Sequence, residues 1–147
     1  MTDTSRIGLI NQGLIAIASG VSGIRQGFYP PPPTLDTASL PAVFAFTGNN
    51  TYDLSEMGVI QMTRIFRVQV ACIPTGQGNP RDREEMVPPL IANVASAINL
   101  KQYSHGLDFV ETIRVVTDSG IVILPEWGAK FIGFELQVEV KYFERSM

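Results

Sequence analysis

Residues that could do chemistry are few in this chain of 147 residues. His105 is the only histidine and Cys72 the only cysteine, which excludes an intrachain disulfide and metal sites built from several His or Cys ligands. Cys72 lies in an apolar stretch, where we expect a buried and unreactive thiol. His105 has Asp108 and Glu111 nearby, but no Ser or Cys stands in a recognisable nucleophile motif. We therefore expect His105 to be an exposed loop residue.

Two further patterns could be taken for functional motifs. The glycine-containing run 76–81 precedes an expected helix, but a dinucleotide-binding fingerprint would need glycine at Arg81 and a parallel βαβ unit. Asp82, Glu84 and Glu85 form an acidic cluster, which suits the positive N-terminal end of a helix. The sequence therefore predicts neither catalysis nor a bound cofactor or metal ion.

The composition is that of an ordinary globular domain. The chain is 45% apolar with a net charge of -3, which suits one domain with a substantial core. Nucleic-acid-binding surfaces are usually basic, so this charge gives no support for one. The uncharged run from Ile7 to Ile24 is interrupted by Asn11 and Gln12. We therefore expect a helix of the domain there, neither a cleaved leader nor a membrane span.

The strongest pattern is the apolar–polar alternation from Phe131 to Phe143, which predicts a long strand with one buried face. A similar alternation between Val59 and Ile73 predicts a second long strand in the same sheet. The expected sheet side of the core consists of Phe66, Val68, Val70, Phe134, Leu136 and Val138. A strand over 42–47 would form an antiparallel hairpin with the second long strand.

Two helices are expected to cover this sheet. The first spans about Ser5 to Gln26, ends at Gly27, and carries an apolar stripe that lies on the sheet or is shared with a second subunit. The second follows the acidic cluster and either starts near Val87 or is kinked at its two prolines. It ends near Gln102, with an apolar side built from Leu90, Ile91, Val94, Ala97, Ile98 and the stem of Lys101; Gly106 is the expected terminator.

The remaining segments predict short strands and loops. Strands over 109–116 and 121–124 are expected to be joined by a hairpin turn at 118–120. The fold class is therefore α+β: a mostly antiparallel sheet of about four to five strands with two helices packed on one face. The chain is expected to form a single α+β domain over 1–147, with projecting loops near 28–39 and 48–58.

Large apolar side chains in these loops are the candidate contacts with another subunit or partner. They are Phe28, Tyr29, Leu35, Tyr52, Leu54 and Met57. The four prolines at 30–33 favour polyproline II geometry, which suits a stiff connector or, alternatively, a ligand for a proline-binding module.

A family resemblance is carried by Tyr29-Pro30-Pro31 and by Leu40-Pro41-Ala42 followed by a strand. Together with the order of the expected elements, this resembles the small tail-terminator or tail-completion proteins of long-tailed bacteriophages. The resemblance covers nearly the whole chain. It implies an α+β subunit that assembles into a six-membered ring, and no functional residue of such families has a motif that transfers to a position here.

The resemblance implies a non-enzymatic virion protein of the tail or neck, made in the bacterial host cytoplasm. Its ring would cap the tail tube, end its elongation and offer a surface to head-completion proteins. Its partners would be itself, the tail tube protein and a head-completion or neck protein, with DNA only as passing cargo and no membrane. The alternatives are another tube or head-completion component, or a small intracellular protein-binding domain.

Overall fold

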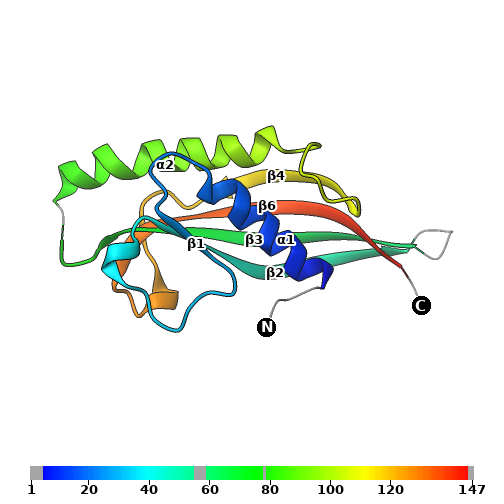
Figure 1. Cartoon of the computed structure of the whole chain (residues 1–147), viewed down its shortest axis with the longest axis horizontal. Helices are drawn as coiled ribbons and strands as arrows, with labels where there is room; N and C mark the ends of the chain where they lie inside the picture. Colours follow the sequence, from blue (N-terminus) through cyan, green and yellow to red (C-terminus); the bar gives the residue numbers. More distant parts are fainter. Residues whose placement is uncertain (1–4, 55–58, 78, 146–147) are drawn as a thin grey trace.

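The computed structural model describes residues 5–54, 59–77 and 79–145. Figure 1 shows a twisted sheet of long strands with two α-helices beside it. The helices share the main hydrophobic core with alternate residues of the central strands, so both cover the same face. The predicted α+β class, the mostly antiparallel sheet and the two helices on one face are thus confirmed.

The sheet has six strands in the order β1-β2-β3-β6-β4, with β5 also paired to β6. Their bounds are β1 Gln26–Phe28, β2 Ala42–Leu54, β3 Val59–Pro74, β4 Val110–Asp118, β5 Val122–Ile123 and β6 Phe131–Arg145. β2, β3, β6 and β4 pair in antiparallel fashion, whereas β1 runs parallel to the start of β2. The predicted β2–β3 hairpin and the shared sheet of β3 and β6 are confirmed.

Alternation places the predicted core side chains on the helix-covered face. Phe66 pairs with Val138, Val68 with Leu136 and Val70 with Phe134 across β3 and β6, and none of the six is exposed to solvent. A smaller core lies on the opposite face at one end of the sheet. It consists of Leu40, Ala42, Phe44, Ala71, Leu124 and Phe131, with Phe28, Leu35, Phe46, Val122 and Trp127 packed against it.

Helix α1 spans Arg6–Ser19, so the predicted helix to Gln26 is too long. Ser5 caps its N-terminus by accepting a hydrogen bond from the Gly8 N–H, and Gly20 is its C-cap. A turn through Gly23, at φ 98°, then leads into β1. The apolar stripe continued beyond the true end because Val21 and Ile24 still pack on the main core from this turn.

Helix α2 spans Pro80–Leu100 with Pro88 and Pro89 inside it, so of the two alternatives the start near Val87 is wrong. A capping box fixes the earlier start: Asn79 accepts from the Asp82 N–H, and the Asp82 carboxylate accepts from the Asn79 N–H. Lys101 is the C-cap, so the helix ends slightly before the expected end near Gln102, and Lys101 is exposed.

The strand boundaries correct two further predictions. β2 continues to Leu54, so residues 48–54 are strand and only 55–58 of the predicted loop lie outside the described residues. The turn formers there accompany a register shift between Thr47 and Asn50. β4 and β5 do not form the predicted hairpin, because each pairs with β6. The strand count rises to six because Gln26–Phe28 forms β1, where the first helix was expected to end and the loop from Phe28 to begin.

Candidate interaction surfaces

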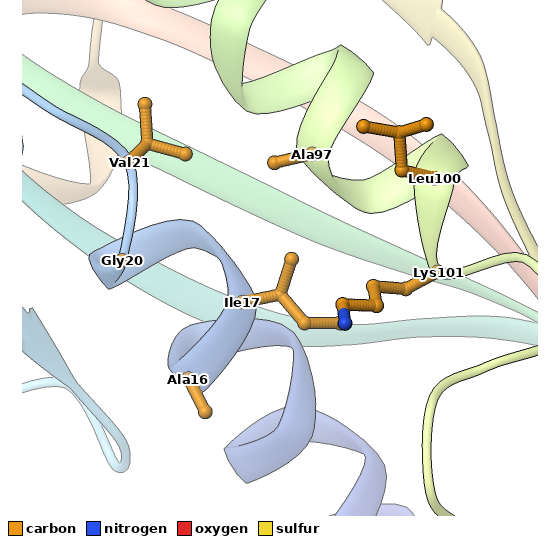
Figure 2. A pocket seen from close by; sticks show the side chains of 7 residues that line it. All are labelled: Ala16, Ile17, Gly20, Val21, Ala97, Leu100 and Lys101. Carbon is orange, nitrogen blue, oxygen red and sulfur yellow. The ribbon is translucent and has the colours of Figure 1, made fainter.

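An open apolar cleft separates the C-terminal half of α1 from the C-terminal end of α2. Figure 2 shows Ile17 and Val21 on one side and Ala97 and Leu100 on the other. Its volume is about 540 Å³, and its lining is Ala16, Ile17, Gly20, Val21, Ala97, Leu100 and Lys101. Small side chains at three of these positions, one of them a glycine, leave the space between the helices unfilled.

Leu100 makes this cleft an unusual feature of the surface. Its side chain is 80% exposed, and Tyr103 just beyond the helix is 73% exposed. Lys101 is the sole charged residue of the cleft lining, and its side chain extends across the cleft toward Ile17 (Figure 2). This surface therefore combines uncovered apolar area with one positive charge, a composition suited to contact with another protein surface.

A polar pocket lies on the opposite face of the sheet, between β3, β6 and the 3-10 helix η2 (Pro125–Trp127). It is about 320 Å³ in volume. Arg67 Nη1 donates to Glu126 Oε1 at 2.9 Å and to Glu135 Oε1 at 3.0 Å. Gln69 Nε2 donates to the same Glu135 oxygen at 3.0 Å. The pocket thus holds two carboxylates against one guanidinium.

The charges of this pocket stabilise one another. Burial alone would raise the pKa of Glu126, but hydrogen bonds from Arg67 and Gln69 and the charge of Arg67 lower it below its usual value. Burial alone would also lower the pKa of Arg67, but its hydrogen bonds and its attraction to Glu126 and Glu135 raise it. Both groups are therefore charged at neutral pH, which favours an ion-pair network over proton transfer.

The side-chain oxygen of Gln69 in this pocket is buried without a hydrogen-bond donor among the described residues. The residue is only 2% exposed, and its Oε1 atom has no hydrogen-bond partner among the described residues. A buried amide oxygen without a donor carries a desolvation cost. The pocket lining therefore presents a buried acceptor and two carboxylates, a set of groups that suits an incoming hydrogen-bond donor.

The two residues whose side chains could be reactive, Cys72 and His105, both lie within the fold. Cys72 is 3% exposed, and burial raises the pKa of its thiol to about 12, which confirms the predicted buried thiol. His105 is half-buried and not exposed as predicted, because it folds back on its own loop, where its Nδ1 accepts a hydrogen bond from the Leu107 N–H at 3.1 Å. Within residues 5–54, 59–77 and 79–145, no three His, Cys, Asp or Glu side chains gather as metal ligands. No helix in the same ranges is long and apolar enough to cross a membrane.

Three of the predicted contact residues pack within their own subunit. The Phe28 ring stacks on Phe44 at a centroid distance of 5.7 Å, Tyr29 packs against the main core, and Leu35 packs against the smaller one. All three are half-buried. The proline-rich crossing that carries them is therefore anchored internally at several points. Their role in contacts with another subunit stays a prediction.

The other three predicted contact residues are Tyr52, Leu54 and Met57. Tyr52 and Leu54 belong to β2, where their backbones pair with Met62 and Ile60 of β3. Met57 lies outside the described residues. Their role in subunit contacts also stays a prediction.

Sequence reasoning did not identify either the cleft or the polar pocket. The sequence signal for the cleft lies in the small residues of the first helix, of which Ala16 and Gly20 line it. The pocket joins residues 67–69, 119–126 and 135, and their spacing in the sequence gives no sign that they meet. The chain matches no model of a known protein family and no curated protein sequence.

Proposed function

We propose that this chain is a self-assembling structural subunit of a phage tail or neck. Copies of it form a ring that caps the tail tube, ends its elongation and joins it to head-completion proteins. The observation that carries the self-assembly is the open cleft between α1 and α2, bordered by the exposed Leu100. Covering apolar surface contributes roughly 25 cal/mol per Å², so association is favoured.

The assignment to a tail or neck comes from the resemblance to tail-terminator proteins. The described elements follow the expected order: an N-terminal helix, a proline-rich crossing, a strand pair, a second helix and a final long strand. The segments Tyr29-Pro30-Pro31 and Leu40-Pro41-Ala42 bound the crossing. Repeated head-to-tail contacts of one subunit close into a ring when the rotation between neighbours allows it.

The polar pocket supports a structural role over an enzymatic one. Arg67 forms ion pairs with both Glu126 and Glu135, and the pKa shifts of Arg67 and Glu126 favour their charged forms. A catalytic acid or base instead needs a pKa near the working pH. Such a network fits a site that holds a loop to a sheet, or one that meets a neighbouring protein.

Native mass spectrometry of the purified protein, with electron microscopy of the same sample, tests the proposal. The expected result is a closed ring, with six copies as implied by the resemblance. A protein that stays monomeric at high concentration and is missing from assembled particles would overturn it.

Replacing Tyr52, Leu54 and Met57 together by Ser is expected to weaken assembly without unfolding the subunit. Unchanged assembly would mean that the predicted loop near 48–58 is only a connector.

A further inference from the structure

The two surfaces described above have complementary chemistry and lie on opposite faces of one sheet. The cleft belongs to the helix-covered face, because both of its helices pack on the main core. The polar pocket belongs to the other face, where Leu124 and Trp127 pack on the smaller core. A single subunit therefore cannot bring its own two surfaces together, whereas two copies can.

The charges of the two surfaces are of opposite sign. The cleft carries only Lys101, for which the described part of the chain contains no carboxylate within ion-pair distance. The pocket carries two carboxylates and one guanidinium, and thus an excess negative charge. Opposite potentials on two surfaces set the orientation in which they meet.

The hydrogen-bonding groups also match. A lysine ammonium has three donors and no acceptor. The pocket offers the Oε1 of Gln69, which is buried and has no donor among the described residues, beside the carboxylates of Glu126 and Glu135. An ammonium group entering the pocket would give the Gln69 oxygen the donor that it lacks.

Each of the two surfaces also has an exposed apolar side chain next to its charged residues. Leu100 precedes Lys101 at the cleft, and Ile123, which is 55% exposed, lines the polar pocket. Among the large apolar residues whose burial the structure describes, the exposed ones are Leu100, Tyr103, Val116 and Ile123. Leu100 borders the cleft and Ile123 borders the polar pocket, so contact between copies would cover both side chains.

We infer that neighbouring copies meet head to tail, with the α1–α2 cleft of one copy against the β5–η2 surface of the next. Lys101 of one copy enters the polar pocket of its neighbour and binds Gln69, Glu126 and Glu135. Ile123 of that neighbour packs against Leu100 and the cleft. This contact uses a different patch on each partner, which is the arrangement that builds rings. The inference rests on the proposed self-assembly and names its contact.

Charge reversal tests this contact. Lys101→Glu and Glu126→Lys are each expected to raise the concentration for half-assembly roughly tenfold or more, since each places like charges together. The double variant restores the opposite pairing and is expected to recover most of the assembly. Lys141→Glu makes the same charge change at an exposed position of β6 and serves as the control, with assembly as in the unaltered chain.

Circular dichroism and thermal unfolding show whether each variant still folds, which matters for Glu126→Lys because it removes an ion pair with Arg67. Ile123→Ser is a second variant that leaves these charges intact, and it is also expected to weaken assembly. Assembly of Lys101→Glu equal to that of the unaltered chain would overturn the contact while leaving the proposed function in place. An unaltered chain that never assembles would instead overturn the proposed function.

Discussion

The side-chain oxygen Oδ1 of Asn99 accepts a hydrogen bond from the backbone N–H of Val115 at 2.9 Å. This bond joins the C-terminal end of α2 to the outer edge of β4. The carbonyl of Gln102 accepts from the Ile113 N–H on the same edge at 3.1 Å. Exposed edge strands invite pairing with other chains. With two of its N–H groups already bonded, β4 is a poor template for pairing with another strand.

Asn99→Ala is therefore expected to loosen this edge. The variant loses one hydrogen bond at a solvent-exposed site, so the free energy of unfolding should fall by about 1 kcal/mol. Hydrogen exchange of the Val115 amide should speed up, because that amide loses its acceptor. Asn99→Asp keeps an acceptor oxygen and should leave the exchange slow. Equal exchange in both variants would show that the bond does not protect the edge.

Leu136→Ala tests the centre of the main core. Leu136 is fully buried in β6, opposite Val68 of β3. Its truncation should lower the free energy of unfolding by about 2–5 kcal/mol, since the lost contacts leave a cavity. Urea denaturation measures the change. A loss below roughly 0.5 kcal/mol, well under the usual cost of such a truncation, would contradict the assigned strand face.

The sequence predicted the elements whose periodicity is set by burial on one face. β6 and the part of β3 from Phe66 to Cys72 alternate because helices cover one face and polar side chains occupy most of the other. The same reliance on periodicity gave a wrong prediction of helix for residues 20–26. Val21 and Ile24 keep the spacing of a helix stripe, yet they pack on the core from a turn.

Some elements depend on strand pairing and helix capping, and local sequence patterns did not predict these elements correctly. Residues 118–120 carry good turn formers, but β4 and β5 each find a better partner in the long β6. The capping box at Asn79 and Asp82 outweighed the two internal prolines and set the start of α2. The cleft and the pocket depend on side chains brought together from separate elements, so no local pattern could reveal them.

Gly133→Ala tests a close approach of two strands. A Cβ atom on Gly133 would lie 1.8 Å from the carbonyl oxygen of Val70, next to the register shift between Ala71 and Ile73. The strands must move apart to admit it, so unfolding should become easier by about 1–3 kcal/mol. Gly76→Ala is the matched control, because a Cβ there meets nothing within 4 Å. Thermal unfolding of the two variants measures the difference, and equal midpoints would contradict this packing.

The buried thiol of Cys72 should make the stability of the folded chain depend on pH in the alkaline range. Burial raises the pKa of its thiol to about 12 in the folded chain, from an ordinary value of 9.0. The folded state therefore binds this proton more tightly than the unfolded state does. The resulting stabilisation is complete below pH 9 and is lost as the pH rises toward 12.

Cys72→Ala removes this pH-dependent contribution along with some packing. Below pH 9 the variant should be less stable than the unaltered chain, because a buried side chain has been truncated. As the pH rises from 9 toward 12, the two free energies of unfolding should converge, since only the unaltered chain loses the contribution of the thiol. Denaturant titrations at several pH values measure this. At pH 8 the folded thiol should also react with iodoacetamide far more slowly than the unfolded thiol. Equal rates at that pH would contradict the burial of Cys72.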